Sequence, residues 1–459
     1  MGRRCILELE DYSFERRARL LYNHLYFSDL PQEYRDVLLK DDLFLDIIKH
    51  AHFNPRVIEW LSTYSRSAHV AVEGYRTHVL SLLTSPEGIW DHAFRSQISN
   101  AARHVLLSFN TVGEWTAITD LEPAFIALHR LCAAKYNERI GPGDFRRALQ
   151  ELDGGFLTCN ATQLSYLNPS VREFVASVIL DERETAEDLI NSAVRFKQLV
   201  NIWKLARTRP GSELWALTLN TELLGRALLR VLDGPSTRWE KSVRGGLVGY
   251  PIDSSLEIRL AFLADVAAIL ESRQLAEMAL RVADNLTREW EHEVVDFTSV
   301  LRLLGSIGKN RWFLEHGGED VYRNLRLGLL DGLEFARADD WLDLLAVPPN
   351  VLEWDDAEEL RLQTALRVFE VKGARDERSD CSTLDELSSL RDSFARLCNE
   401  YGLDLRTQVG QLDEDITERE EQAENRDNSD EYLRERAVVR PAVFTEDDVR
   451  EMFRTLSEG

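Results

Sequence analysis

Apolar residues recur at helical spacing along most of this chain, and that periodicity is the strongest constraint on its fold. In the segment 14–30, Ala18, Leu21 and Leu25 fall on one face of a helix, and Ser13 is placed to cap it. Similar spacing continues through most of the remaining sequence. The sequence therefore predicts a mainly α-helical protein.

The segment 1–88 is expected to form a compact helical bundle. Pro31 should begin the second helix, because proline is favoured in the first helical turn. Asp42 should cap the third helix through its carboxylate. Two further helices are predicted over 57–65 and 71–83.

The segment 89–181 carries the only convincing β-structure that the sequence predicts. A turn at 141–144 precedes an amphipathic helix that ends at Leu152. Two strand-like runs, 155–158 and 163–167, flank a turn-prone Cys-Asn-Ala sequence, which indicates a β-hairpin. Helix, helix, hairpin and helix in this order are typical of a winged-helix domain.

The segment 182–412 is expected to be an α-solenoid-like region of helical repeats without a fixed period. Its main predicted helices are 186–205, 212–232, 255–291, 320–335 and 384–401. The last segment, 413–459, begins with an acidic run that is either a solvated helix face or a flexible linker. It ends in a small helix, Glu446–Leu456, that docks back on the chain or binds a partner.

The composition excludes several classes of protein. A net charge of −24 argues against broad binding to nucleic acid or to anionic membranes, which need a surplus of Lys and Arg. The five cysteines are dispersed and no CxxC occurs, so neither a disulfide framework nor a zinc site is expected. No membrane span or secretory signal is evident, and we expect a cytoplasmic protein.

No motif for catalysis or metal binding is found, so the chain is not expected to be an enzyme. The nearest phosphate-loop look-alike, Gly305–Asn310, has Leu303 at the first glycine position and Asn310 in place of the magnesium-binding hydroxyl. No Walker B carboxylate follows a strand. Arg146 and Arg147 could contact DNA from a recognition helix, but neighbouring acids and the global charge oppose this.

Three segments resemble a bacterial branch of the STAND NTPases, the signal-transduction ATPases with numerous domains. They are Leu20–Pro31 (LLYNHLYFSDLP), Ile47–His50 (IIKH) and Phe53–Leu61 (FNPRVIEWL). The resemblance covers about residues 5–180, is weak through the repeats and revives at Phe444–Leu456. The resemblance implies a helical lid, a winged helix and a repeat-built sensor. The nucleotide-binding domain of the family is absent here, apart from a strand-like run, Cys5–Leu9, that would complete its sheet.

The resemblance also implies three nucleotide-contacting residues. Pro55 matches the lid proline that packs on adenine, and Arg56 could reach a phosphate. Asn168 stands where the family has a histidine that contacts the β-phosphate of ADP. The simpler alternative is that Asn54 and Asn168 cap helices, with Arg56 a solvated residue of the first turn.

The resemblance implies a regulatory and sensor half of a STAND-type ATPase, in bacterial anti-phage defence. It would hold no cofactor alone, and ATP or ADP would bind with an ATPase domain in cis or in trans. A protein ligand would bind the repeats. The alternatives are a stand-alone helical scaffold or adaptor and a DNA-binding regulator.

Overall fold

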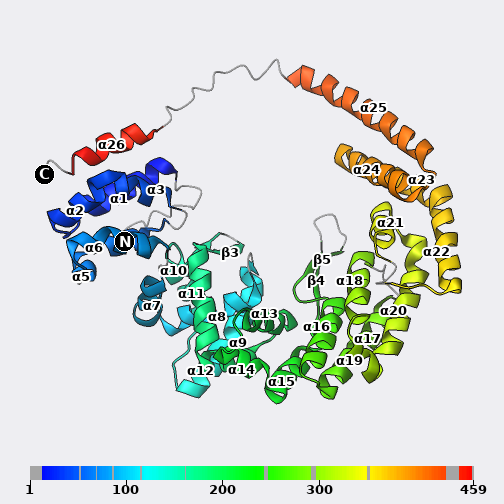
Figure 1. Ribbon diagram of the computed structural model, residues 1–459, viewed down its shortest axis with the longest axis horizontal. Helices are drawn as coiled ribbons and strands as arrows, with labels where there is room; N and C mark the ends of the chain where they lie inside the picture. Colours follow the sequence, from blue (N-terminus) through cyan, green and yellow to red (C-terminus); the bar gives the residue numbers. More distant parts are fainter. Residues whose placement is uncertain are drawn as a thin grey trace. The chain divides into compact units, whose positions relative to one another are not determined.

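The computed structural model describes residues 13–50, 53–68, 70–84, 87–113, 116–160, 162–241, 247–290, 296–348, 352–430 and 444–456. Within these ranges the protein is mainly helical, with five short strands, which confirms the predicted fold class at that level (Figure 1). The chain divides into two compact units, unit 1 (1–234 with 440–459) and unit 2 (235–439). The predicted strand Cys5–Leu9 lies outside the described residues.

Unit 1 begins with a helical bundle that the last described helix joins. Its elements are α1 (Phe14–Tyr26), α2 (Gln32–Leu39), a 3₁₀ turn (Lys40–Asp42), α3 (Leu43–Lys49), α4 (Pro55–Leu61), α5 (Tyr64–Ser67), α6 (Val72–Thr84) and α26 (Glu446–Arg454). Ser13 accepts a hydrogen bond from the Arg16 N–H, so the predicted cap of α1 is confirmed. The apolar face of α1 is buried in a core that also contains Val449 and Phe453 of α26.

Asp42 does not cap α3, so that prediction is wrong. Its backbone φ of 54° lies in the left-handed region, and its side chain makes no capping hydrogen bond. The carboxylate instead accepts a hydrogen bond from Arg450 Nε at 2.9 Å. Local sequence cannot reveal a partner 408 residues away.

The next part of unit 1 contains a three-stranded antiparallel sheet. Its elements are α7 (Glu87–Ser96), α8 (Asn100–Val112), β1 (Thr116–Ala117), α9 (Ile118–Tyr136), α10 (Asp144–Leu152), β2 (Leu157–Cys159), β3 (Gln163–Tyr166) and α11 (Pro169–Asp181). The strands lie in the order β1-β3-β2, with Thr158 opposite Ser165. Asn160 Oδ1 accepts a hydrogen bond from the Gln163 N–H at 2.6 Å and closes the turn. The predicted hairpin is confirmed.

Four shorter helices complete unit 1. They are α12 (Arg183–Ser192), α13 (Phe196–Thr208), α14 (Glu213–Thr218) and α15 (Thr221–Val231). The single helices predicted over 186–205 and 212–232 are therefore each divided in two. At the second break, Asn220 Oδ1 accepts hydrogen bonds from the Glu222 and Leu223 N–H groups, so a new cap begins α15.

Unit 2 is a hairpin followed by helices. Its elements are β4 (Thr237–Lys241), β5 (Leu247–Pro251), α16 (Leu256–Ile269), α17 (Arg273–Trp290), α18 (Phe297–Ile307), α19 (Arg311–Phe313), a π-helical turn (Leu314–Gly318), α20 (Glu319–Gly332), a 3₁₀ turn (Leu333–Phe335), α21 (Ala338–Leu345), α22 (Asp356–Val368), a second π-helical turn (Phe369–Gly373), α23 (Ala374–Asp380), α24 (Leu384–Tyr401) and α25 (Arg406–Asp430). The β4–β5 hairpin was not predicted. The predicted helix 255–291 breaks at Glu271, whose φ is 48°. The described part of the acidic run, as far as Asp430, is helical, and the prediction for 384–401 is confirmed.

Candidate functional site

Two helices of unit 1 begin with the same Asn-Pro sequence, and these starts hold the residues predicted to contact nucleotide. Asn54 and Asn168 are both buried with extended backbone, at φ of −147° and −150°. In each case Oδ1 accepts a hydrogen bond from the backbone N–H two residues on, at 2.8 Å and 2.9 Å. Pro55 and Pro169 occupy the first helical position. The capping interpretation is confirmed at both starts.

Arg56 is not the solvated residue that the simpler interpretation predicted. Its guanidinium carbon lies 4.7 Å from the centre of the Phe156 ring and 6.0 Å from that of Trp90. A Cβ on Gly155 would come within 3.3 Å of Arg56 Nη2, so the glycine leaves room for the guanidinium. Nη1 is buried and has no hydrogen-bond partner among the described residues. Burial lowers the pKa of Arg56, and Glu59 partly offsets this.

A short relay of hydrogen bonds joins Trp90 to the start of α11. Trp90 Nε1 donates to Ser170 Oγ at 3.1 Å, and Ser170 Oγ donates to Asn168 Oδ1 at 2.9 Å. All three residues are buried. The Trp90 ring also packs against Phe156, with 5.4 Å between ring centres. The relay satisfies the polar atoms that α7 and α11 bury against each other.

We name Arg56, Trp90, Phe156, Asn168 and Ser170 the junction cluster. It ties α4 of the first bundle to α7, to the turn before β2 and to the start of α11. Two of the three predicted site residues therefore belong to one cluster, and the third lies beside it in the first turn of α4.

Sequence reasoning missed the three other members of the cluster. Trp90 shares an apolar helix face with Ala93 and Phe94, which marks it only as a core residue. Phe156 follows the Gly154-Gly155 pair, which predicted a helix stop but no stacking partner. Ser170 follows the Asn-Pro cap motif, which in sequence gives no sign of its hydrogen bond with Trp90.

A groove of about 670 Å³ lies beside the same helix start. It is lined by residues of α8, β3, α11 and α13, including Asn110, Tyr166, Arg172, Asn201 and Lys204. Two cationic side chains among amides and a phenol suit a polar ligand with negative charge. The groove has acidic Glu173 in its lining as well, which limits the excess of positive charge.

A pair of buried histidines forms a second polar centre. His104 Nδ1 lies 2.9 Å from His129 Nδ1, and His129 Nε2 lies 3.3 Å from Asp144 Oδ2. If His129 Nε2 donates to the carboxylate and His129 Nδ1 carries no proton, His104 Nδ1 donates the hydrogen bond between the two rings. Burial, with nearby His129 and Arg103, lowers the pKa of His104 to about 4.

In the described part of the chain, no group of three or more His, Cys, Asp or Glu side chains is placed to hold a metal ion. Over the same residues, every helix is too short or too polar to cross a membrane. Gly305, in the phosphate-loop look-alike, lies inside α18. Comparisons with protein-family models, with curated proteins and with solved structures find no match.

Proposed function

We propose that this chain is the regulatory and sensor half of a STAND-type signalling ATPase, acting in bacterial anti-phage defence with an ATPase domain in cis or in trans. The order of parts supports this: a helical bundle, then a small sheet among helices, then more helices. The motifs Leu20–Pro31 and Phe53–Leu61 lie in the first bundle, which would be the lid. The segment 182–412 would be the α-solenoid-like sensor for a protein ligand. The chain itself would not hydrolyse ATP.

We assign a winged helix to the segment 89–181. Its support is the element order α8, β1, α9, α10, β2, β3, together with the strand order β1-β3-β2. In such a domain the hairpin returns to pair with the short strand that follows the first helix. The sequence pattern predicted the helices and the hairpin but not β1, which pairs with β3.

The junction cluster is the observation that carries the proposal. A lid that must separate from a winged helix on activation needs a defined contact between them. Arg56 provides this contact from the first bundle, because its guanidinium packs on the rings of Phe156 and Trp90. The Arg56 guanidinium packs on two rings, and its buried Nη1 has no hydrogen-bond partner among the described residues. This arrangement is costly unless an anionic group accepts a hydrogen bond from Nη1.

The residues of the cluster differ in how well they fit ADP. Arg56 is the better candidate, because Nη1 has no partner among the described residues, and a shift of the guanidinium would bring this buried atom to a phosphate oxygen. Asn168 Oδ1 already accepts two hydrogen bonds from Ser170, so only its Nδ2 could donate to a phosphate. In this proposal Arg56 holds the phosphate, and Asn168 keeps α11 in place as its cap.

Nucleotide titration tests the proposal. The full chain alone should show no measurable ADP binding, and the complex with its ATPase partner should bind ADP. Arg56→Ala should weaken ADP binding by the complex about tenfold, the value of one charge-assisted hydrogen bond. Arg66→Ala is the matched control, because Arg66 also lies over an aromatic ring, that of Trp60, outside the cluster.

Two results would contradict the proposal at different levels. A complex that binds no adenine nucleotide would remove the ATPase association. A complex that binds ADP equally well with Arg56→Ala would leave the association in place and remove the role of Arg56.

A stand-alone scaffold is the second candidate, and the surface of unit 2 favours it. Several large apolar side chains are exposed there, including Trp239, Leu360 and Val371 at 60%, 66% and 74%. Exposed apolar groups mark a protein-binding surface where they form a contiguous patch. The scaffold predicts that the chain captures its protein ligand without nucleotide, and that Leu360→Asp with Val371→Asp abolishes capture.

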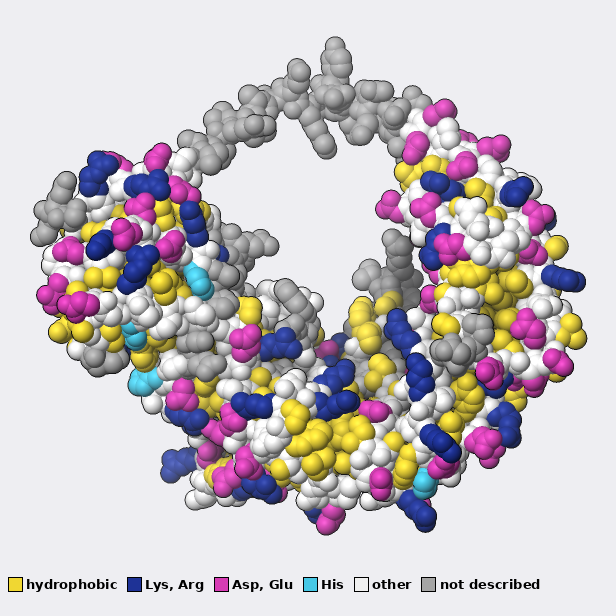
Figure 2. Space-filling model, in the orientation of Figure 1, with side chains coloured by type: hydrophobic (Ala, Val, Ile, Leu, Met, Phe, Trp, Pro, Cys, Tyr) yellow, Lys and Arg dark blue, Asp and Glu magenta, His cyan; other side chains and the backbone are white. Residues whose placement is uncertain are grey.

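DNA binding has less support. On α10, Arg147 is paired with Asp144, and only Arg146 of the two candidates is directed to solvent without such a pair among the described residues. Figure 2 shows acidic side chains interspersed with basic ones over the face in view. A salt-dependent DNA shift that Arg146→Ala with Arg147→Ala removes would revive this function.

A further inference from the structure

α26 packs onto the first bundle through one apolar face. Val449 and Phe453 are buried, and the Phe453 ring stacks on Phe44 with 4.4 Å between centres and 9° between planes. Tyr22 meets the same ring edge-on at 5.7 Å. Leu456, just after the helix, is buried as well. The bundle side of this contact is formed by α1 and α3.

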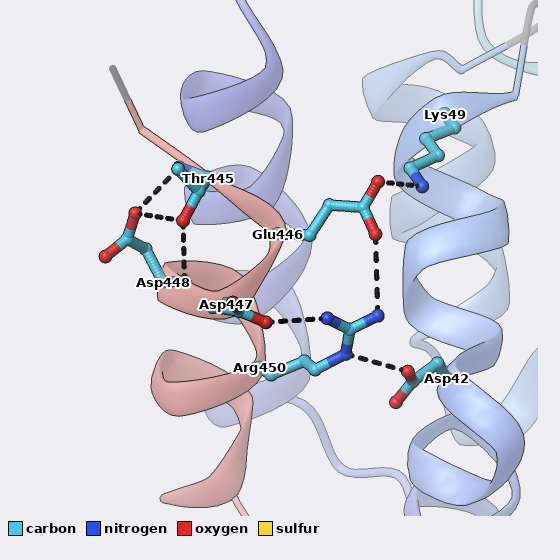
Figure 3. A network of polar contacts seen from close by, with 7 residues as sticks. All are labelled: Asp42, Lys49, Thr445, Glu446, Asp447, Asp448 and Arg450. Carbon is cyan, nitrogen blue, oxygen red and sulfur yellow. Dashed lines mark hydrogen bonds and ion pairs between the residues drawn. The ribbon is translucent and has the colours of Figure 1, made fainter.

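Polar contacts fix the register of α26. Glu446 forms an ion pair with Lys49, and Arg450 Nε donates to Asp42 at 2.9 Å (Figure 3). Tyr22 Oη and Thr455 Oγ1 lie 2.8 Å apart near the other end. We call Tyr22, Asp42, Phe44 and Lys49 the α26-binding surface. It requires an acid near the start of the helix and a base one turn later.

The polar part of the contact is weak, although Val449 and Phe453 belong to the core of the bundle. The side chains of Lys49, Glu446, Arg450 and Asp42 are between 41% and 48% exposed, so these ion pairs are weak. α26 has nine residues, too few for a stable helix in isolation. Its start is capped by its own residues, since Thr445 and Asp448 form a reciprocal capping box.

The docking of α26 affects how the chain connects the two units. Unit 2 is inserted between α15 and α26, both of which belong to unit 1. With α26 docked, unit 2 is tied to unit 1 at both of its ends. With α26 released, the tie at Gly234 remains and the second is lost.

We propose that the α26-binding surface is an exchangeable helix-binding site whose resident occupant is α26. The partner that fits it in trans is an amphipathic helix with an acidic residue at the position of Glu446 and an arginine four residues later, at the position of Arg450. Its apolar residues stand at the positions of Val449, Met452, Phe453 and Leu456. That spacing is i, i+3, i+4, i+7, the pattern by which helices bind grooves in other proteins. The inference does not depend on the proposed ATPase.

A labelled peptide of residues 444–456 (FTEDDVREMFRTL) tests the site on the full chain. Phe453→Asp in the chain should release the resident helix and leave the surface intact. The peptide should then bind this variant at least about tenfold more tightly than the wild type, in which α26 competes. Val371→Asp is the matched control, because Val371 is an exposed apolar residue of unit 2, and it should bind as the wild type does.

A charge exchange between half-exposed residues tests the same contact without changing the buried core. In the Phe453→Asp background, Lys49→Glu should weaken the peptide about threefold, and a peptide with Glu446→Lys should recover the loss. If the Phe453→Asp chain does not fold, Phe453→Ala, which removes the ring that stacks on Phe44, replaces it as the releasing variant. A folded releasing variant that binds no peptide would overturn the proposal, as would equal binding to all variants.

Discussion

The two units differ in what they bury. Among the described residues, the buried polar side chains of unit 1 are Asn54, Ser62, Ser67, His104, Ser108, Thr111, Thr116, His129, Asn168, Ser170, Asp188, Ser192, Gln198, Ser212 and Thr218. Those of unit 2 are Ser254, Arg259, Glu358 and Ser393. Units of comparable size thus reach a folded core by different means.

Several of the buried polar groups in unit 1 are matched to specific partners. Gln198 Nε2 donates to Thr111 Oγ1 at 3.1 Å, and Asp188 accepts from Lys135 and Tyr136. Such pairs satisfy only one packing of the helices, because a displaced partner leaves a buried group unsatisfied. We infer that unit 1 responds most to pH and to polar substitutions.

The helices of unit 2 pack mainly through apolar side chains. Trp341, Phe369 and Phe394 form a chain of rings across α21, a π-helical turn and α24, at 5.9 Å and 6.3 Å between centres. Contacts of this kind depend on volume more than on direction. Unit 2 should therefore respond most to the loss of apolar volume.

The largest expected effect is the loss of the Trp341 ring. Trp341 is fully buried, so Trp341→Ala should cost about 3–5 kcal/mol of stability in unit 2. Hydrogen exchange resolved by segment should show faster exchange in α18, α21 and α24, with α8–α11 unchanged. Trp239→Ala is the control, because Trp239 is 60% exposed in the same unit. Equal loss of protection in both units would contradict the separation.

Acidification should act on unit 1 through His104, with the next largest effect. The pKa of this residue is lowered to about 4 from an ordinary 6.5, chiefly by burial. The unfolded chain therefore takes up the proton first as the pH falls. The stability that His104 contributes is complete above pH 6.5 and declines by about 3 kcal/mol towards pH 4. Exchange in α8 and α9 between pH 7 and 4.5 measures it, and His104→Gln should reduce the slope. An unchanged slope would contradict the assignment.

In unit 2 the corresponding groups have the opposite sign. Burial raises the pKa of Asp340 and of Glu377, which are half-buried carboxyl groups. The folded state then holds protons that the unfolded state releases. These two groups stabilise unit 2 as the pH falls through their folded pKa values, and Glu377→Gln should remove part of that gain. If the stability of both units changed in the same direction as the pH falls, this difference between the units would be contradicted.

Sequence patterns predicted most helices because they report local chemistry. The 3.6-residue period, Ser13, Asn54 and Asn168 all act within one turn, and each was placed correctly. The β4–β5 hairpin was missed because its strands show no clear apolar alternation, although Gly245-Gly246 between them is a turn signal. The break at Glu271 was missed because the apolar period continues through it.

The candidate site was predicted only in part, for a physical reason. Cap motifs identified Asn168 and located Arg56, but the surroundings of Arg56 come from Trp90 and Phe156, which lie far away in the sequence. Nothing local distinguishes a first-turn arginine in water from one held on two rings. Asp42 failed in the same way, since its partner Arg450 is visible only in three dimensions.

The smallest expected effect is the difference in stability loss between removing a simple helix cap, Asn220, and removing a cap that also takes part in a hydrogen-bond relay, Asn168. Asn220→Ala, at the exposed start of α15, should cost about 1 kcal/mol, the value of a capping hydrogen bond. Asn168→Ala should cost about 2 kcal/mol, because it also leaves the Ser170 hydroxyl, which accepts from Trp90 Nε1, without its own acceptor. Local exchange in α15 and in α11 gives both values under the same conditions. Equal losses would mean that the relay adds nothing, and that the buried polar groups of unit 1 act as separate local caps.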